Sequence, residues 1–200
     1  MFINKILQKC GLILLIILMS ACGTSPKTHF YLLSSDREIN NNATDSVAIG
    51  VWKVKLPDII DRPEIVTRTG PYTINLADFH RWAGGLGSNV SLLIANELSY
   101  NLKTGYVDVS PWSTYRNFDY QVKVHIRDFD GELGGESSLE GAYILLNGKG
   151  DKKIVEEIFS FKEKVKGEKY NDLAKAMSLL VVDLSNEISK TILKMEDKVR

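Results

Sequence analysis

The most regular pattern in the chain is a stripe of large apolar residues at helical spacing near its C-terminal end. Between Asp172 and Met195 these residues recur every three or four positions, at Leu173, Met177, Leu180, Leu184, Ile188 and Ile192. Such a spacing puts them on one face of an α-helix. A shorter stripe follows the glycines at positions 84, 85 and 87, at Val90, Leu93, Ile94, Leu98 and Leu102. With Ser88 as its N-cap, this stripe predicts a second amphipathic helix.

Alternation of apolar and polar residues predicts β-strands in the rest of the chain. Residues 47–54 alternate and end before Pro57, and residues 120–127 alternate in the same way. Shorter strand candidates are residues 29–33, 64–68, 72–76, 139–147 and 152–165. Because Asn147-Gly148 is a turn signal, residues 120–165 are expected to form a three-stranded antiparallel meander.

The order of these elements predicts an α+β fold, a two-layer sandwich. We expect a mixed, mostly antiparallel sheet with the two amphipathic helices on one face. No linker or repeat divides residues 47–200, so they are expected to form a single domain. The other face of the sheet is polar along residues 120–127, which leaves open whether it is solvated or meets a partner. The polar residues there are Gln121, Lys123, His125 and Arg127.

The first residues have the layout of a bacterial secretory signal. Lys5 and Lys9 precede an apolar run over residues 12–19, and two small residues follow that run. The run is shorter than the roughly 20 residues that a membrane-spanning helix needs. Residues 1–21 are therefore predicted to be a signal peptide that is removed by cleavage.

The segment Met19-Ser20-Ala21-Cys22 resembles the bacterial lipobox, with methionine in place of the usual leucine. The resemblance implies cleavage between Ala21 and Cys22 and a lipid on the Cys22 sulfur. It also implies the periplasmic face of the outer membrane as the destination, because Gly23 stands where an aspartate usually signals retention at the inner membrane. Residues 22–46 would then form the lipidated N-terminus, a polar tether and the first short strand. The alternative is an uncleaved signal anchor that ends in an unmodified Cys22.

Composition narrows the function classes. The chain has 25 basic and 25 acidic residues scattered along its length, so nucleic acid is not an expected partner. Its two cysteines, Cys10 and Cys22, both lie in the first 22 residues. The body can therefore form neither a disulfide nor a cysteine-based metal site. We expect no metal and no cofactor besides the covalent lipid on Cys22.

No residues with catalytic spacing stand out, and the chain is not expected to be an enzyme. The three histidines, His29, His80 and His125, are far apart in the sequence and lack a patterned acidic companion. The acidic segment 128–140 fails as a calcium loop, because leucines occupy its sixth and twelfth positions, and is interpreted as a solvated hairpin loop. Three acids near prolines are expected in turn and capping roles: Asp58, Asp61 and Glu64.

Aromatic residues are the main candidates for contacts. Four of them lie in segments that are expected to be loops, namely Phe79, Trp82, Trp112 and Tyr115. Exposed, they would form a binding surface, and buried, they would extend the core. Burial is favoured for Trp82, because large aromatic side chains are usually mostly buried. The candidate partner-binding residues are Phe79, Arg81 and Trp82.

Several segments in a fixed order, behind the lipobox, resemble one known family. They are "YLL" at residues 31–33, "IGVWKVKLPDIIDRPEIVTR" at 49–68, "HRWAGGL" at 80–86, "VKVHIRDFDG" at 122–131 and "AMSLLVVDLSNEI" at 176–188. The chain is similar to the ABC-type transport auxiliary lipoproteins, which include the PqiC-like accessory lipoproteins of MCE lipid-transport systems. One departure is Gly84-Gly85, since family members often carry an acid and a proline after the Arg-Trp pair.

The resemblance implies an outer-membrane-anchored periplasmic accessory lipoprotein that docks or stabilises a transport conduit. The implied partners are an MCE-domain protein with its inner-membrane permease, the outer membrane, phospholipid, and further copies of the chain itself. One rival is a pilot or chaperone-like lipoprotein of another envelope assembly. The other is an anchored periplasmic enzyme, which would require Gly84–Gly87, Arg81 and an acid such as Asp61 to converge on one pocket.

Overall fold

The structure is a computed structural model that describes residues 26–37, 47–112 and 117–199. The predicted signal peptide, the cleavage site at Ala21 and Cys22, and Tyr115 lie outside the described residues. Single-domain organisation over residues 47–200 and the tether over residues 22–46 stay predictions.

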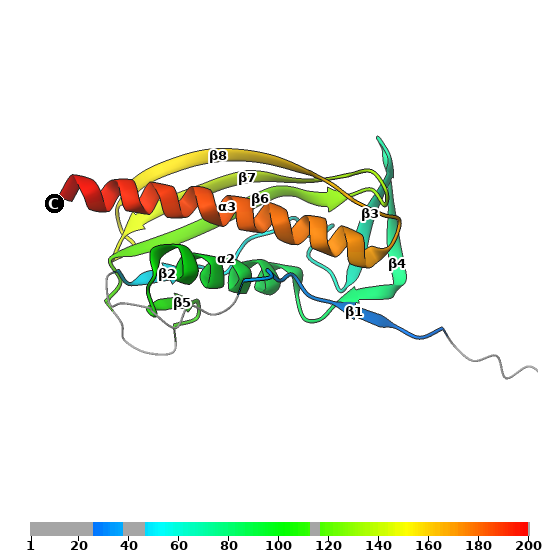
Figure 1. The fold of residues 1–200 in the computed structure, drawn as a ribbon, viewed down its shortest axis with the longest axis horizontal. Helices are drawn as coiled ribbons and strands as arrows, with labels where there is room; N and C mark the ends of the chain where they lie inside the picture. The colour runs from blue at the N-terminus through cyan, green and yellow to red at the C-terminus, as the bar shows by residue number, and fades with distance from the viewer. Residues whose placement is uncertain (1–25, 38–46, 113–116, 200) are drawn as a thin grey trace, which may run out of the picture.

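The described residues form two sheets and two helices (Figure 1). The larger sheet has the strand order β5-β2-β6-β7-β8, and the smaller has the order β1-β4-β3. The strands of the larger sheet are β2 (Ile49–Val51), β5 (Val107–Val109), β6 (Tyr120–Gly131), β7 (Glu136–Asn147) and β8 (Lys153–Lys164). The strands of the smaller sheet are β1 (His29–Tyr31), β3 (Glu64–Gly70) and β4 (Thr73–Trp82). The helices are α2 (Leu86–Leu102) and α3 (Tyr170–Val199).

The α+β fold is confirmed, with helices packed on a mixed sheet. Strands β6, β7 and β8 form the expected antiparallel meander, and β2 pairs in parallel with both β5 and β6. Figure 1 shows α3 lying along the larger sheet, with α2 beside it and the smaller sheet near the end where α3 begins. The six residues of the long apolar stripe are all buried: Leu173, Met177, Leu180, Leu184, Ile188 and Ile192. They join the same core as residues of both sheets, so the two sheets share one apolar interior.

Helix α2 begins earlier than the sequence predicts. Its N-cap is Gly85, with extended backbone and no side-chain cap bond, so the expected cap at Ser88 is wrong. A Cβ on Gly87 would lie 3.1 Å from the Val54 carbonyl oxygen, and the Ser91 hydroxyl accepts a bond from the Val54 N–H at 2.9 Å. Gly87 therefore lets the first turn of the helix pack closely on the backbone at Val54.

Two strand predictions differ in extent. The strand expected over residues 47–54 has only three residues in β2. Beyond Val51 the pairing with β6 shifts by one residue and resumes at Lys55, and within this gap the Val54 N–H donates to Ser91 of α2. Strand β4 continues six residues beyond the expected 72–76, to Trp82. The interpretation of the segment around Phe79 and Trp82 as a loop is therefore wrong.

Candidate functional site

The N-terminal segment, residues 26–37, is the part of the described chain nearest to the predicted anchor. Strand β1 pairs in parallel with β4, in the register His29 with His80 and Tyr31 with Trp82. Beyond β1, Leu33 is buried, and the backbone N–H of Ser34 donates to Ser178 Oγ on α3 at 3.1 Å. The segment is thus held against the body by both backbone pairing and side-chain contacts.

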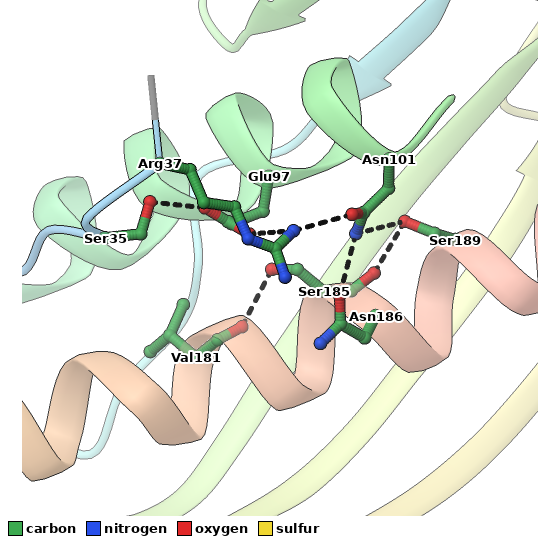
Figure 2. Close-up of polar contacts among 8 residues, drawn as sticks. All are labelled: Ser35, Arg37, Glu97, Asn101, Val181, Ser185, Asn186 and Ser189. Atoms are coloured by element: carbon green, nitrogen blue, oxygen red, sulfur yellow. Dashed lines mark hydrogen bonds and ion pairs between the residues drawn. The ribbon is translucent and has the colours of Figure 1, made fainter. Parts of the chain in front are cut away.

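A buried carboxylate fixes the far end of this segment (Figure 2). The side chain of Glu97 on α2 is only 1% exposed, and Arg37 Nη1 lies 3.0 Å from its Oε2 atom. Ser35 Oγ donates to the other carboxylate oxygen of Glu97 at 2.5 Å. Arg37 also donates to Asn101 Oδ1 at 2.8 Å and lies over the Tyr100 ring. A buried charge is costly unless it is paired, so Glu97 requires the N-terminal segment in place.

The same network continues from α2 to α3. Asn101 Nδ2 donates to Asn186 Oδ1 at 3.0 Å and to Ser189 Oγ at 3.1 Å. Figure 2 shows these contacts as one chain of polar groups that runs from the N-terminal segment across both helices. We call this chain of polar groups the polar seam; its members are Ser35, Arg37, Glu97, Asn101, Asn186 and Ser189. The polar seam fixes where the N-terminal segment crosses the two helices.

A groove of about 640 Å³ lies between the N-terminal segment and the first half of α3. Because Leu33 points into the core, its neighbours point outward, and Phe30 and Leu32 are 67% and 60% exposed. Both line the groove together with Leu179, which is 41% exposed, and with the cation of Lys175. We call these four side chains the N-terminal groove. Large apolar side chains gathered and exposed in this way mark a contact surface.

The predicted partner-binding residues lie at the end of β4. Trp82 is 3% exposed and belongs to the core, as expected for it, whereas Phe79 is 40% exposed. Arg81 Nη2 pairs with Glu64 Oε1 at 3.1 Å, and Arg62 binds the other oxygen of Glu64. The hydrogen bond from Arg62, followed by weaker charge effects of both arginines, lowers the pKa of Glu64. A partner that binds here would contact Phe79 and the Arg81–Glu64 pair.

Two histidines that are far apart in the sequence meet across the parallel β1–β4 pair. The rings of His29 and His80 are stacked at 5.4 Å, and His80 also stacks on Tyr170 at 4.0 Å. Tyr31 Oη lies 2.7 Å from His80 Nδ1. Burial, and then the charge of His29, lower the pKa of His80. Sequence reasoning could not find this cluster, because nothing local indicates the parallel pairing.

The acidic segment near residue 130 is not a solvated loop, which corrects the sequence interpretation. Asp128 and Asp130 lie in β6, and Arg68 of β3 pairs with Asp130 at 2.5 Å and with Asp128 at 3.6 Å. The bond with Asp130 raises the pKa of Arg68, whereas burial and the neighbouring Asp130 raise the pKa of Asp128. These contacts join the smaller sheet to the larger one. Only the hairpin connection at residues 132–135 is a loop.

The outer face of the larger sheet is covered at one end and exposed at the other. Trp52 Nε1 donates to Gln121 Oε1 at 2.8 Å, and Lys123 Nζ lies 4.6 Å from the centre of a Trp52 ring. Trp112 lies in an irregular segment, as the sequence predicts, and its ring packs edge-on against Trp52. The side chains of His125 and Arg127 are exposed. The alternation of apolar and polar residues around Trp52 does not indicate that its side chain covers Gln121.

The described residues contain no group of three or more histidine, cysteine, aspartate or glutamate side chains that could hold a metal ion. Asp58 and Asp61 lie in a turn closed by hydrogen bonds to the Pro57 carbonyl. None of Gly84–Gly87, Arg81 and Asp61 lines the N-terminal groove. Across the described ranges, no helix has the length and apolarity that a membrane span requires.

Comparison with known proteins identifies the family. The family model for the ABC-type transport auxiliary lipoprotein component matches residues 31–189, and the chain belongs to this family. It is a transport-auxiliary lipoprotein family and not a known enzyme family. Membership associates the chain with an ABC transport system and with the membranes of the cell envelope. Among curated proteins the comparison finds no match.

Solved structures show that the fold recurs. A Xanthomonas campestris protein of the family DUF330 has 16% identity and a TM-score of 0.69, covering 86% of this chain and 100% of its own. A further protein, described only as uncharacterized, has 18% identity and a TM-score of 0.68, covering 84% of this chain and 99% of its own. A PelC dodecamer from Paraburkholderia phytofirmans is more distant, with 11% identity, a TM-score of 0.44, and coverage of 72% and 89%. At such identities the first two likenesses concern the fold alone, and the PelC likeness is too distant to support an argument.

Proposed function

We propose that this chain is the outer-membrane-anchored accessory lipoprotein of an intermembrane lipid-transport system, in which an MCE-domain protein forms the conduit. The observation that carries the proposal is the family match, which extends over residues 31–189. The lipobox-like segment that ends at Cys22 supports a lipid-anchored position. The contact surfaces at Phe79 and at the N-terminal groove support a role in placement and binding without covalent chemistry.

The anchor is a lipid on Cys22, exposed as the new N-terminus by cleavage after Ala21. Several acyl chains at one site hold a protein at a bilayer far more durably than a single chain does. The body would then stay at the periplasmic face of the outer membrane. There it would meet the far end of a conduit that starts at the inner-membrane permease.

The partner surface in this proposal is the end of β4, where Phe79 is exposed beside the Arg81–Glu64 ion pair. An exposed aromatic ring next to a partly screened ion pair has the composition of protein interfaces, in which aromatic residues and arginine are enriched. Phospholipid would pass along the conduit. Self-association of the chain into a ring would match a ring-shaped partner.

Affinity isolation tests the transport role. The lipidated protein is expressed together with the MCE-domain protein and its permease, crosslinked mildly in intact cells, and isolated from the envelope. We expect the MCE-domain protein in the isolated material. Its repeated absence, with both proteins expressed, would refute the proposal, and recovery of a secretin or pilus component instead would favour the pilot role.

Lipid labelling tests the anchor separately. With a labelled fatty acid supplied to the cells, Cys22→Ser should abolish incorporation of the label and the association of the mature chain with outer-membrane fractions. Label that persists in this variant would mean that the N-terminus has been misinterpreted.

A further inference from the structure

The N-terminal groove stands out among the surfaces of the described residues because three large apolar side chains are exposed in it near the predicted anchor, within a lining that also holds the charged residues Asp36, Arg37 and Lys175. Phe30 and Leu32 are 67% and 60% exposed, although they lie in a segment whose backbone is fixed by pairing with β4 and by Ser178. Leu179 of α3, at 41% exposed, faces the same groove. Order in the backbone together with exposed apolar side chains points to an external contact.

The length of the chain outside the structure limits what can reach this groove. Only residues 23–25 separate Cys22 from Pro26, the first described residue. At up to about 3.6 Å per residue, four steps of extended chain span about 14 Å. Phe30 lies four residues further on, so it can be at most about 29 Å from the anchored sulfur along a fully extended chain. A lipid on Cys22 would therefore keep this end of the body close to the bilayer.

We propose that the N-terminal groove rests on the bilayer surface, with Phe30, Leu32 and Leu179 inserted among the headgroups. This inference rests on the lipid anchor of the proposed function. Lys175 lines the same groove, and exposed Lys27 lies just before β1. Apolar side chains that enter the interface beside cations that meet lipid phosphates are the usual composition of peripheral membrane contacts.

A bilayer fits the groove better than a second copy of the chain. Stable protein interfaces bury roughly 800 Å² on each partner, which far exceeds what three partly exposed side chains supply. A membrane contact beside a covalent anchor can be weak, because the tether already keeps the two surfaces at a high effective concentration. The polar seam from Arg37 to Ser189 holds the segment so that its apolar side chains stay directed outward.

Site-specific fluorescence in vesicles tests the contact. After cleavage and lipidation, Cys10 is gone and the Cys22 sulfur is blocked, so an introduced cysteine is the one free thiol of the mature chain. An environment-sensitive dye is placed at Ser34→Cys, which lines the groove without replacing its apolar residues. The control is Ile158→Cys on β8, where the native side chain is 73% exposed.

The lipidated protein is reconstituted into vesicles of phosphatidylethanolamine with a minority of phosphatidylglycerol and of nitroxide-labelled lipid. We expect the nitroxide to quench the dye at position 34 several-fold more than the dye at position 158. In the double variant Phe30→Ser with Leu32→Ser, quenching at position 34 should fall to the level of the control. Because both apolar side chains are exposed, these substitutions leave the core intact.

Equal quenching at the two positions, in protein whose lipid is verified by mass spectrometry, would overturn the membrane contact while leaving the anchor in place. Crosslinks between two copies through position 34 would overturn it as well, by assigning the groove to self-association. A mature chain without lipid on Cys22 would refute the anchor itself, and the inference with it.

Discussion

Replacing Arg37 with alanine should destabilise the protein, because it removes the cation that pairs with a buried carboxylate. The Glu97 side chain is 1% exposed, and Arg37 lies 3.0 Å from it with 35% of its own side chain exposed. Removing one partner of a fully buried ion pair costs about 3–5 kcal/mol. Solvent at Arg37 screens the pair, and Ser35 still donates to Glu97, so the expected loss is smaller. We expect about 1–3 kcal/mol.

Urea unfolding of the mature chain measures this loss as a lower midpoint at unchanged slope. For a domain of this size, a loss of about 2 kcal/mol corresponds to roughly 4–8 °C in melting temperature. Glu97→Gln completes a double-mutant cycle with Arg37→Ala, since glutamine keeps an acceptor for Ser35 without the charge. The loss from Arg37→Ala should be much smaller in the Glu97→Gln background.

Two results would refute this reasoning. The first is an Arg37→Ala variant as stable as the parent, which would mean that the N-terminal segment contributes nothing to the body. The second is an equal loss in both backgrounds, which would assign the effect to the packing of Arg37 over Tyr100 instead of its charge.

Three further predictions concern the core, a carboxylate and the partner surface. Leu184→Ala, at a fully buried position, should cost about 2–5 kcal/mol in thermal or urea unfolding. The control Leu179→Ala, at an exposed position of the same helix, should change the free energy of unfolding by less than about 0.5 kcal/mol. Burial raises the pKa of Asp128 above its unfolded value, so its charged form opposes folding at neutral pH. Asp128→Asn should therefore stabilise the fold at neutral pH. The gain should shrink as pH falls through the raised pKa of Asp128 and be gone below the usual range of an aspartate, and a loss of stability at neutral pH would contradict this. Phe79→Ala should weaken crosslinking to the MCE-domain protein at unchanged melting temperature, and undiminished crosslinking would exclude Phe79 from the contact.

The helices and the meander could be predicted because their signals are local. The stripe from Leu173 to Ile192 repeats at helical spacing, and Asn147-Gly148 fixes the turn between β7 and β8. Each of these signals needs only neighbouring residues, and tertiary packing agrees with it.

The predictions that are wrong concern segments in which contacts distant in sequence override the local pattern. The strand at residues 47–54 is interrupted after Val51, where the register with β6 shifts and Val54 bonds to Ser91, 37 residues away. The sequence around Asp130 indicates a solvated acid, because no local signal shows that Arg68 of β3 pairs with it. The end of β4 has no regular alternation, so its pairing with β1 gives no local signal.

The candidate site could be predicted only in part. The sequence offers Phe79 and Arg81 as candidate contacts, but it does not show that the partner of Arg81 is Glu64, for which it predicts a turn or capping role. No local pattern indicates the N-terminal groove, because the exposure of Phe30 and Leu32 depends on how α3 lies beside them. No sequence pattern links Arg37 to Glu97 across a distance of 60 residues.

A photo-crosslinking measurement at Phe79 tests the central claim most directly. A photoreactive phenylalanine analogue is incorporated at position 79 of the lipidated chain, and at position 158 as the control, in cells that express the whole transport system. Illumination should produce an adduct with the MCE-domain protein from position 79 and little or none from position 158. No adduct from either position, with all components present in the envelope, would contradict the claim that this chain contacts the conduit through the end of β4.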